Sequence, residues 1–360
     1  MTTNFRNKLK SNLNESYLVK KYKELRSIRK LPKYFIRNDS GKTIKSIVFL
    51  SPSVRYAVGG IKVIYNQVAV INSLRTELTA SVLHPRDEKF SCTWFDHAAI
   101  FKTSLDFDPA HDFVMIPEIW AVPHARLLHK LGIRYGIHVQ NGYVILDHNG
   151  AELDAAYRHA ALILAISDDT AECVKLAFPD CADKIWRANF SVDAAKFSAS
   201  ENKENIICYM PRKLRKHSEL VVAFLTKHIP AHWTIKSIDG VDENAVAAIF
   251  ATSKIFLSFS EFEGCGLPPV EAALSGCQVI GYTGEGAKEY WDQEIFTEIH
   301  SGDIRSFVKS VLNKISEMDK AEFTCQAEAV KKLANKYSPK NELQDMKFLS
   351  DKVLDILRTV

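Results

Sequence analysis

Two glutamates flank a turn rich in glycine and proline in residues 260–281, SEFEGCGLPPVEAALSGCQVIG. Glu263 precedes the turn, and Glu271 falls in the first turn of the helix that Pro268 or Pro269 can start. Four backbone N–H groups can point outward at the start of that helix, at Gly264, Cys265, Gly266 and Leu267. Together with the helix dipole they form an anion site that suits a diphosphate.

The two carboxylates need different explanations. Glu271 interacts favourably with the helix dipole, which accounts for an acidic residue at that position. Glu263 has no such explanation, because it precedes the glycines and would crowd the same anion. A carboxylate beside a phosphate is costly unless it binds hydroxyl groups or faces a developing positive charge. A sugar offers both.

Alternating strands and helices must position this turn. Residues 44–50, IKSIVFL, predict a buried strand, and residues 60–74 predict a helix. ALILAIS (161–167) continues the pattern, with Ser167 as the N-cap of the next helix, and NIICYM (205–210) starts it again. This order predicts two mostly parallel α/β sheets, in which ligands bind beyond the carboxyl ends of the strands. The turn at 260–268 follows such a strand, KIFLSF.

A chain of 360 residues predicts two domains, and apolar periodicity fades into a polar stretch near 198–205. We therefore expect an N-terminal Rossmann-like domain at 43–197 and a C-terminal one at 198–335. A basic arm at 1–42 precedes them. A final helix at 336–360 is expected to pack back toward the N-terminal domain.

Composition and charge narrow the class of protein. The chain is 46% hydrophobic and 25% charged, as in soluble globular proteins, and no apolar run is long enough for a membrane span or signal peptide. Its seven cysteines include no C-x-x-C pair, which argues against a zinc site and favours a reducing cytoplasm. Residues 1–42 carry a net charge of +9 within a total of +4. This arm predicts an anionic partner, a phospholipid surface or nucleic acid, or else is a solvated basic helix.

A family resemblance extends these inferences. Residues 263–280, EGCGLPPVEAALSGCQVI, resemble the E-G-F-G-L-P-x-x-E-A-x-A-x-G-x-P-V-I signature of retaining GT-B glycosyltransferases of family 4, in which seven residues separate two glutamates. Cys265 replaces the usual aromatic residue, and Gln278 replaces the usual proline. NFSVDAAKF (189–197) and GGIKVIY (59–65) are similar to other segments of the family, so the resemblance covers about residues 44–335.

The resemblance implies a GT-B fold, with two Rossmann-like domains facing each other across a cleft. It implies that Glu271 binds the ribose hydroxyls of the donor and that Glu263 lies near the transferred sugar and the diphosphate. Backbone donors to the donor's phosphate and sugar would come from Gly264, Cys265, Gly266 and Leu267. Gly59 and Gly60 would form the glycine loop of the N-terminal domain beside the donor.

The family also uses an arginine and a lysine, in G-R-x-x-x-x-K, to neutralise the diphosphate. Residues 209–217 read YMPRKLRKH, so Arg212 matches, while Lys213 or Lys216 would replace the lysine. A solvated basic turn is the alternative. His138 lies two residues before the expected position of a histidine that faces the transferred sugar, and it can equally be a structural histidine. A strand would place His138 and Gln140 on one face.

The resemblance thus implies a retaining hexosyl- or pentosyltransferase that needs no metal or other cofactor. We expect a UDP-, dTDP- or GDP-linked donor and a glycan or lipid-linked acceptor. This fits bacterial surface polysaccharide synthesis, such as O-antigen, lipopolysaccharide or capsule. The basic arm would then bind the anionic inner face of the cell membrane, giving a cytoplasmic, peripheral enzyme that binds no nucleic acid. No G-x-G-x-x-G supports an oxidoreductase. A GT-B sugar-nucleotide epimerase and an inactive scaffold are the alternatives.

Overall fold

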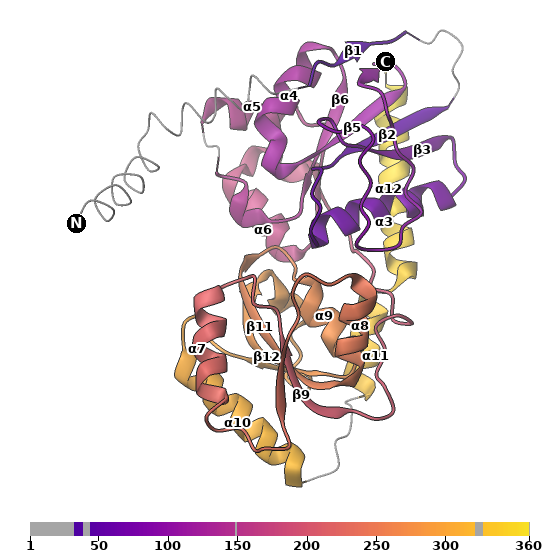
Figure 1. Cartoon of the computed structure of the whole chain (residues 1–360). Helices are drawn as coiled ribbons and strands as arrows, with labels where there is room; N and C mark the ends of the chain where they lie inside the picture. Colours follow the sequence, from indigo (N-terminus) through magenta and orange to yellow (C-terminus); the bar gives the residue numbers. More distant parts are fainter. Residues whose placement is uncertain (1–31, 39–43, 148–149, 321–326, 360) are drawn as a thin grey trace, which may run out of the picture.

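Two parallel β-sheets lie one beyond the other in the computed structural model, which describes residues 32–38, 44–147, 150–320 and 327–359 (Figure 1). The first sheet has the strand order β3-β2-β5-β6-β7-β8 and the second β10-β9-β11-β12-β13, and every strand pair in both is parallel. The predicted α/β architecture is confirmed. Most of the basic arm, residues 1–31 and 39–42, lies outside the described residues.

The N-terminal half is built on the six-stranded sheet. Its strands are β2 (Lys45–Leu50), β3 (Leu78–Leu83), β5 (Asp112–Pro117), β6 (Arg134–Val139), β7 (Leu162–Ala165) and β8 (Ile185–Arg187). Its helices are α3 (Gly59–Ser73), α4 (Ala121–Lys130), α5 (Ala151–His159) and α6 (Asp168–Ala177). Strands β1 (Phe35–Ile36) and β4 (Asp106–Phe107) form a separate pair. Ser167 caps α6 as predicted, because its side chain accepts a hydrogen bond from the Thr170 N–H.

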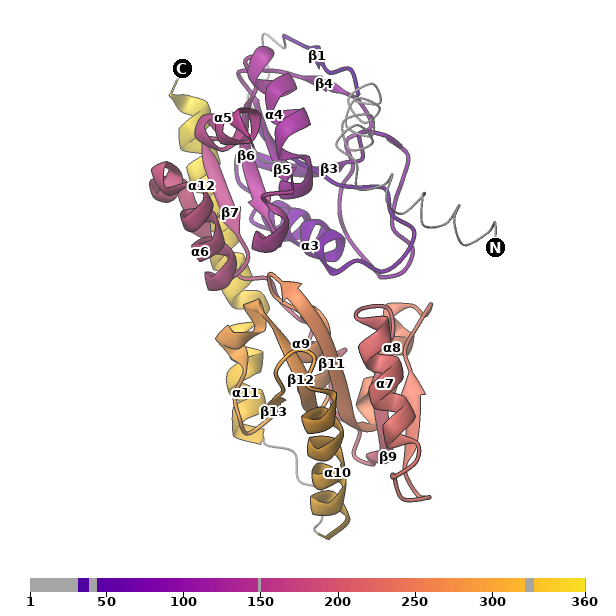
Figure 2. The same cartoon turned by 90° about the vertical axis from the view of Figure 1, so that its left-hand side faces the viewer.

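The C-terminal half is built on the five-stranded sheet. Its strands are β9 (Glu204–Tyr209), β10 (Thr234–Ser237), β11 (Ser253–Glu263), β12 (Gln278–Glu285) and β13 (Phe296–Glu298). Its helices are α7 (Arg215–Leu225), α8 (Glu243–Thr252), α9 (Leu267–Leu274), α10 (Ile304–Lys320) and α11 (Ala327–Lys336). The central strands β5 and β11 are buried over most of their length, because helices cover both faces of each sheet (Figure 2).

The chain passes between the halves twice. It first passes through residues 188–203, between β8 and β9, and it returns through α12 (Pro339–Arg358). Figure 2 shows α12 rising from α11 in the C-terminal half along the N-terminal half. The buried face of α12 packs on α3, β2 and β5, with the side chains of Met346, Leu349, Val353, Leu354 and Leu357 in the same core. Within the described residues, no helix has the length and apolar character needed to span a membrane.

Candidate active site

A cavity of about 930 Å³ lies between the two halves. The segments that follow four strands line it: Pro52 after β2, Glu118 after β5, Gln140 after β6 and Met210 after β9. Glu263, the last residue of β11, also lines it. The carboxyl ends of both sheets therefore meet at one cavity, which is where parallel α/β folds hold their ligands.

The structure brings most of the predicted site residues together there. Nine of them line the cavity: Gly59, Gly60, Arg212, Lys213, Glu263, Cys265, Gly266, Leu267 and Glu271. Three do not. Lys216 is exposed on α7, His138 is buried in β6 at 1% exposure, and Gly264 lies at the contact between the halves.

The turn at 264–267 joins the end of β11 to the start of α9. Gly266 is the N-cap residue and Leu267 the first residue of the helix, one position before the predicted start. The first N–H groups of α9 have no partner within the helix, as at any helix start. Cys265, within this turn, is buried with its Sγ atom 3.6 Å from the Tyr337 hydroxyl, and burial raises the pKa of its thiol to about 12.

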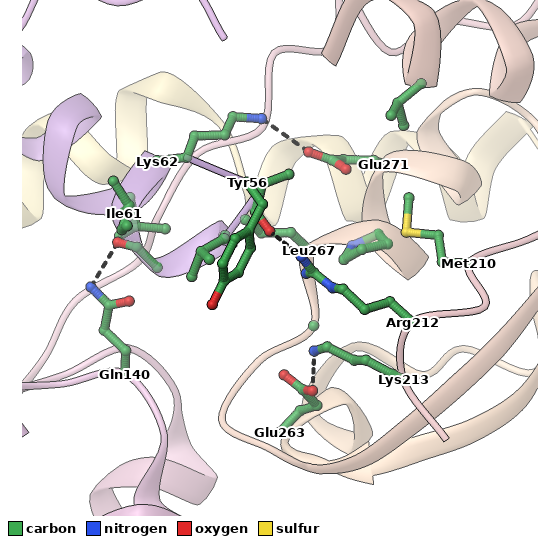
Figure 3. Close-up of a pocket in the computed structure, with 18 of the residues that line it drawn as sticks. Tyr56, Ile61, Lys62, Gln140, Met210, Arg212, Lys213, Glu263, Leu267 and Glu271 are labelled. Atoms are coloured by element: carbon green, nitrogen blue, oxygen red, sulfur yellow. Dashed lines mark hydrogen bonds and ion pairs between the residues drawn. The ribbon is translucent and has the colours of Figure 1, made fainter. Parts of the chain in front are cut away.

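Strained backbone flanks the ion pair between Lys213 and Glu263. Phe262, directly before Glu263, has a φ of 49°, and Leu214, directly after Lys213, has a φ of 45°. Residues with bulky side chains rarely adopt this left-handed conformation, which costs about 1–3 kcal/mol and persists only where the surroundings impose it. Figure 3 shows the Lys213 ammonium group paired with the Glu263 carboxylate, and each of these residues is next to one of the left-handed residues.

Gly264 allows the two halves to touch. A Cβ atom at this position would lie 2.1 Å from the carbonyl oxygen of Gln140, so no side chain fits there. The Ser167 hydroxyl also donates a hydrogen bond to the Gly264 carbonyl at 2.6 Å. Gln140 makes a second link, because its Nε2 atom donates to the Gly60 carbonyl at 3.0 Å (Figure 3). One glycine of each motif therefore lies against Gln140: Gly60 at its side chain and Gly264 at its backbone carbonyl.

Arg212 reaches across the cavity toward the loop before α3. Its guanidinium donates to the Ala57 carbonyl at 2.7 Å and lies 5.5 Å from the centre of the Tyr56 ring (Figure 3). A guanidinium over an aromatic face is stabilised by the ring quadrupole. These two contacts therefore orient the guanidinium group of Arg212. None of the carboxylates of the described residues forms an ion pair with it.

Lys62 of α3 joins two carboxylates of the C-terminal half. Its Nζ atom lies 3.0 Å from Oε1 of Glu271 and also contacts Glu243, which in turn pairs with Lys196 at 2.6 Å. Burial lowers the pKa of Lys62, but Glu271 and Glu243 outweigh burial and hold that pKa above its ordinary value. Burial likewise raises the pKa of Glu243, but Lys62 and Lys196 outweigh it and lower that pKa.

Glu118 is a cavity carboxyl group that the sequence analysis missed. It follows β5, is 9% exposed, and accepts a hydrogen bond from the Asn141 N–H at 3.1 Å. Burial raises its pKa to about 7, and the backbone hydrogen bonds only partly oppose this. A signal was present, because the segment FVMIPEIW places this glutamate directly after an apolar strand.

His138 lies one layer behind the cavity. Its Nδ1 atom is 3.4 Å from Gln140 Nε2, and its ring contacts the edge of Phe49. Burial lowers the pKa of His138 to about 3, so its ring is neutral at physiological pH. Gln140, two residues on, is the side chain of this strand end that faces the cavity.

The part of the chain that the structure describes contains no group of three or more histidine, cysteine or acidic side chains arranged to hold a metal ion. That the reaction needs no metal stays a prediction.

No protein-family model matches the chain. Solved structures that are similar over 87% of the chain and 100% of their own include a sucrose-phosphate synthase from Thermosynechococcus elongatus, with a TM-score of 0.66 and 10% identity. Anabaena Alr3699/HepE in complex with UDP matches with a TM-score of 0.61 and 12% identity. The lipopolysaccharide outer core galactosyltransferase WaaB matches with a TM-score of 0.60 and 15% identity. These likenesses show that the chain has the GT-B fold, as predicted.

A curated relative is similar over a shorter stretch. The alpha-1,6-glucosyltransferase of Actinobacillus pleuropneumoniae serotype 7 (strain AP76) is 33% identical over 84 residues, which are 22% of this chain. The match spans about a quarter, 26%, of the length of that relative.

Proposed function

We propose that the protein is a glycosyltransferase of the retaining, family 4 type, which moves a sugar from a nucleotide-sugar donor to a glycan or lipid-linked glycan. One observation carries this proposal. The start of α9, two cationic side chains and two carboxylates converge on a single cavity at the carboxyl ends of both sheets. Helix N-termini and cations bind phosphates, and carboxylates accept hydrogen bonds from sugar hydroxyls.

In the proposed reaction, the diphosphate lies against the start of α9, between Arg212 and Lys213. Departure of the nucleoside diphosphate builds negative charge, and fixed cations and backbone N–H groups stabilise that charge without reorganising. Lys213 then shares its charge between the diphosphate and Glu263. The carboxylate of Glu263 faces the sugar that is transferred, and Glu271 binds the ribose.

The similar proteins favour a UDP-linked hexose as the donor. The HepE structures contain UDP, UDP-glucose, or UDP and glucose, and WaaB is named a galactosyltransferase. The curated relative is named a glucosyltransferase. We further propose a role in bacterial surface polysaccharide synthesis, with the basic residues 1–42 holding the enzyme at the anionic inner face of the membrane. Deleting residues 1–42 should abolish co-sedimentation with anionic vesicles, and unchanged co-sedimentation would contradict this attachment.

Nucleotide binding is the first test. UDP, GDP, dTDP and ADP are added separately, and the melting temperature is measured. A nucleotide present at 100 times its dissociation constant stabilises the native protein by about 2.7 kcal/mol. If none of the four raises the melting temperature, the proposed function is wrong.

Transfer or hydrolysis of the matching nucleotide sugars is the second test. Glu263→Ala should abolish product formation. The wild-type activity should survive EDTA. Glu261→Ala is the matched control, because Glu261 belongs to the same strand but is exposed and does not line the cavity. Equal activity in both variants would argue against a role for Glu263, and nucleotide binding without any turnover would favour the scaffold alternative.

A further inference from the structure

Four charged side chains, three of them largely buried, form a chain of alternating sign beside the cavity. The order is Lys196, Glu243, Lys62 and Glu271, and each contacts the next. The side chains of Glu243, Lys62 and Glu271 are between 9% and 11% exposed. Lys62 is the member that comes from the N-terminal half, where it projects from α3 toward Glu271 (Figure 3).

The local sequence gives no reason for a lysine at position 62. Lys62 lies in the first turn of α3, close to the positive end of the helix dipole, where a cation is unfavourable. A charged residue that its own helix disfavours, but that pairs with groups distant in the sequence, is expected at functional sites. Lys62 makes two ion pairs with the other half of the protein, and both partners line the cavity.

Glu271 is the end of the charge chain. Lys62 contacts its Oε1 atom, and none of the described residues donates a hydrogen bond to its Oε2 atom. One carboxylate oxygen is therefore fixed by a cation from the opposite half, and the other is available to a ligand in the cavity. Hydrogen bonds that a carboxylate oxygen accepts from hydroxyl groups are stronger than hydrogen bonds between neutral groups.

We propose that Lys62 is a positioning residue that holds the carboxylate of Glu271 in one orientation, so that its free oxygen accepts hydrogen bonds from the ribose hydroxyls of the donor. This inference rests on the proposed function, in which Glu271 binds the ribose. It adds that the N-terminal half completes the ribose site of the C-terminal half. Without Lys62, Glu243 would keep Lys196 as a partner, but Glu271 would have no cation among the described residues to orient it.

The test compares UDP with 2′,3′-dideoxy-UDP, which lacks both ribose hydroxyls, by titration calorimetry on the full chain. ADP and its dideoxy analogue are measured in parallel. The wild type should bind the ribonucleotide about tenfold to 100-fold more tightly than the dideoxy compound, since hydrogen bonds to a charged group are lost. Lys62→Met should reduce this ratio to about threefold or less. Lys62→Arg, which keeps the charge, should restore most of it.

The ratio separates positioning from a merely structural role. If Lys62→Met weakens both nucleotides equally and keeps the ratio, the proposal is wrong. Lys175→Met is the control, since Lys175 is an exposed lysine on α6 that also pairs with a glutamate; it should leave both affinities unchanged. If Lys62→Met does not fold, Lys62→Leu, which also cannot donate a hydrogen bond, takes its place with the same criterion.

Glu271→Gln distinguishes failure of this inference from failure of the proposed function. If Glu271→Gln removes the ratio and Lys62→Met does not, only the role of Lys62 is refuted. If the wild type binds the ribonucleotide and the dideoxy compound equally tightly, or if Glu271→Gln keeps the wild-type preference, Glu271 does not bind the ribose. Both proposals about this carboxylate are then refuted.

Discussion

Glu118→Gln is expected to stabilise the protein at alkaline pH and to have little effect in acid. In the folded protein, burial raises the pKa of Glu118 from 4.5 to about 7. Between these two values the folded chain keeps a proton on Glu118 that the unfolded chain releases. The free energy of unfolding therefore falls as the pH rises through this window. Above about pH 7 the folded protein bears the whole cost of an ionised, buried Glu118.

The size of the effect follows from the same rise in pKa. At about 1.4 kcal/mol per pKa unit, a rise from 4.5 to about 7 corresponds to about 3 kcal/mol. Glutamine has nearly the same shape and can accept the hydrogen bond from the Asn141 N–H, but it cannot ionise. At pH 8 the variant should therefore be more stable than the wild type by up to about 3 kcal/mol, and the gain should shrink toward zero near pH 4.5.

The assay is urea unfolding of both proteins at pH 5, 6, 7 and 8. Glu152→Gln, which changes an exposed glutamate on α5, is the matched control. The reasoning fails if the difference between Glu118→Gln and the wild type does not change with pH. In that case the carboxylate would be solvated or paired inside the cavity.

Three further predictions concern single residues. Gly264→Ala should lower the rate of sugar transfer by about 100-fold, because its methyl group would force Gln140 and the opposite half away; an unchanged rate would contradict the close contact. Cys265, whose pKa burial raises to about 12, should resist iodoacetamide at pH 8 in the native protein and react after unfolding, as mass spectrometry would show; native labelling would refute its burial. His138→Gln should make the free energy of unfolding less sensitive to acid. Burial lowers the pKa of His138 to about 3, so below about pH 6.5 the unfolded chain takes up a proton that the folded chain does not. If the free energies of unfolding of variant and wild type changed in parallel from pH 6.5 to 4, this prediction would be contradicted.

The sequence predicts the elements and the two glutamates well, because those signals are local. The apolar run at 44–50 becomes β2, and the glycine-proline turn after KIFLSF becomes the link between β11 and α9. Alternation along a strand also placed His138 and Gln140 on one face. How deeply each of the two side chains is buried depends on the packing of distant segments, which the local sequence does not determine. Of these two residues, the structure places only Gln140 at the cavity.

The choice between Lys213 and Lys216 depends on backbone geometry that the sequence does not state. The left-handed residue Leu214 turns the chain between them, so Lys213 meets Glu263 while Lys216 follows α7 into solvent. Lys62 was missed for another reason. Its partner Glu271 is 209 residues away, and only the packing of the two halves brings them together.

The return of α12 to the N-terminal half has a consequence during synthesis on the ribosome. The groove formed by α3, β2 and β5 is filled by apolar side chains from residues 346–357, so this half cannot close its core while it is being made. The C-terminal half needs no such later segment for its own sheet. We expect it to fold first although it is translated second, and the earlier half to depend on chaperones until α12 emerges. For the same reason, a chimaera that exchanges N-terminal halves must carry its matching α12.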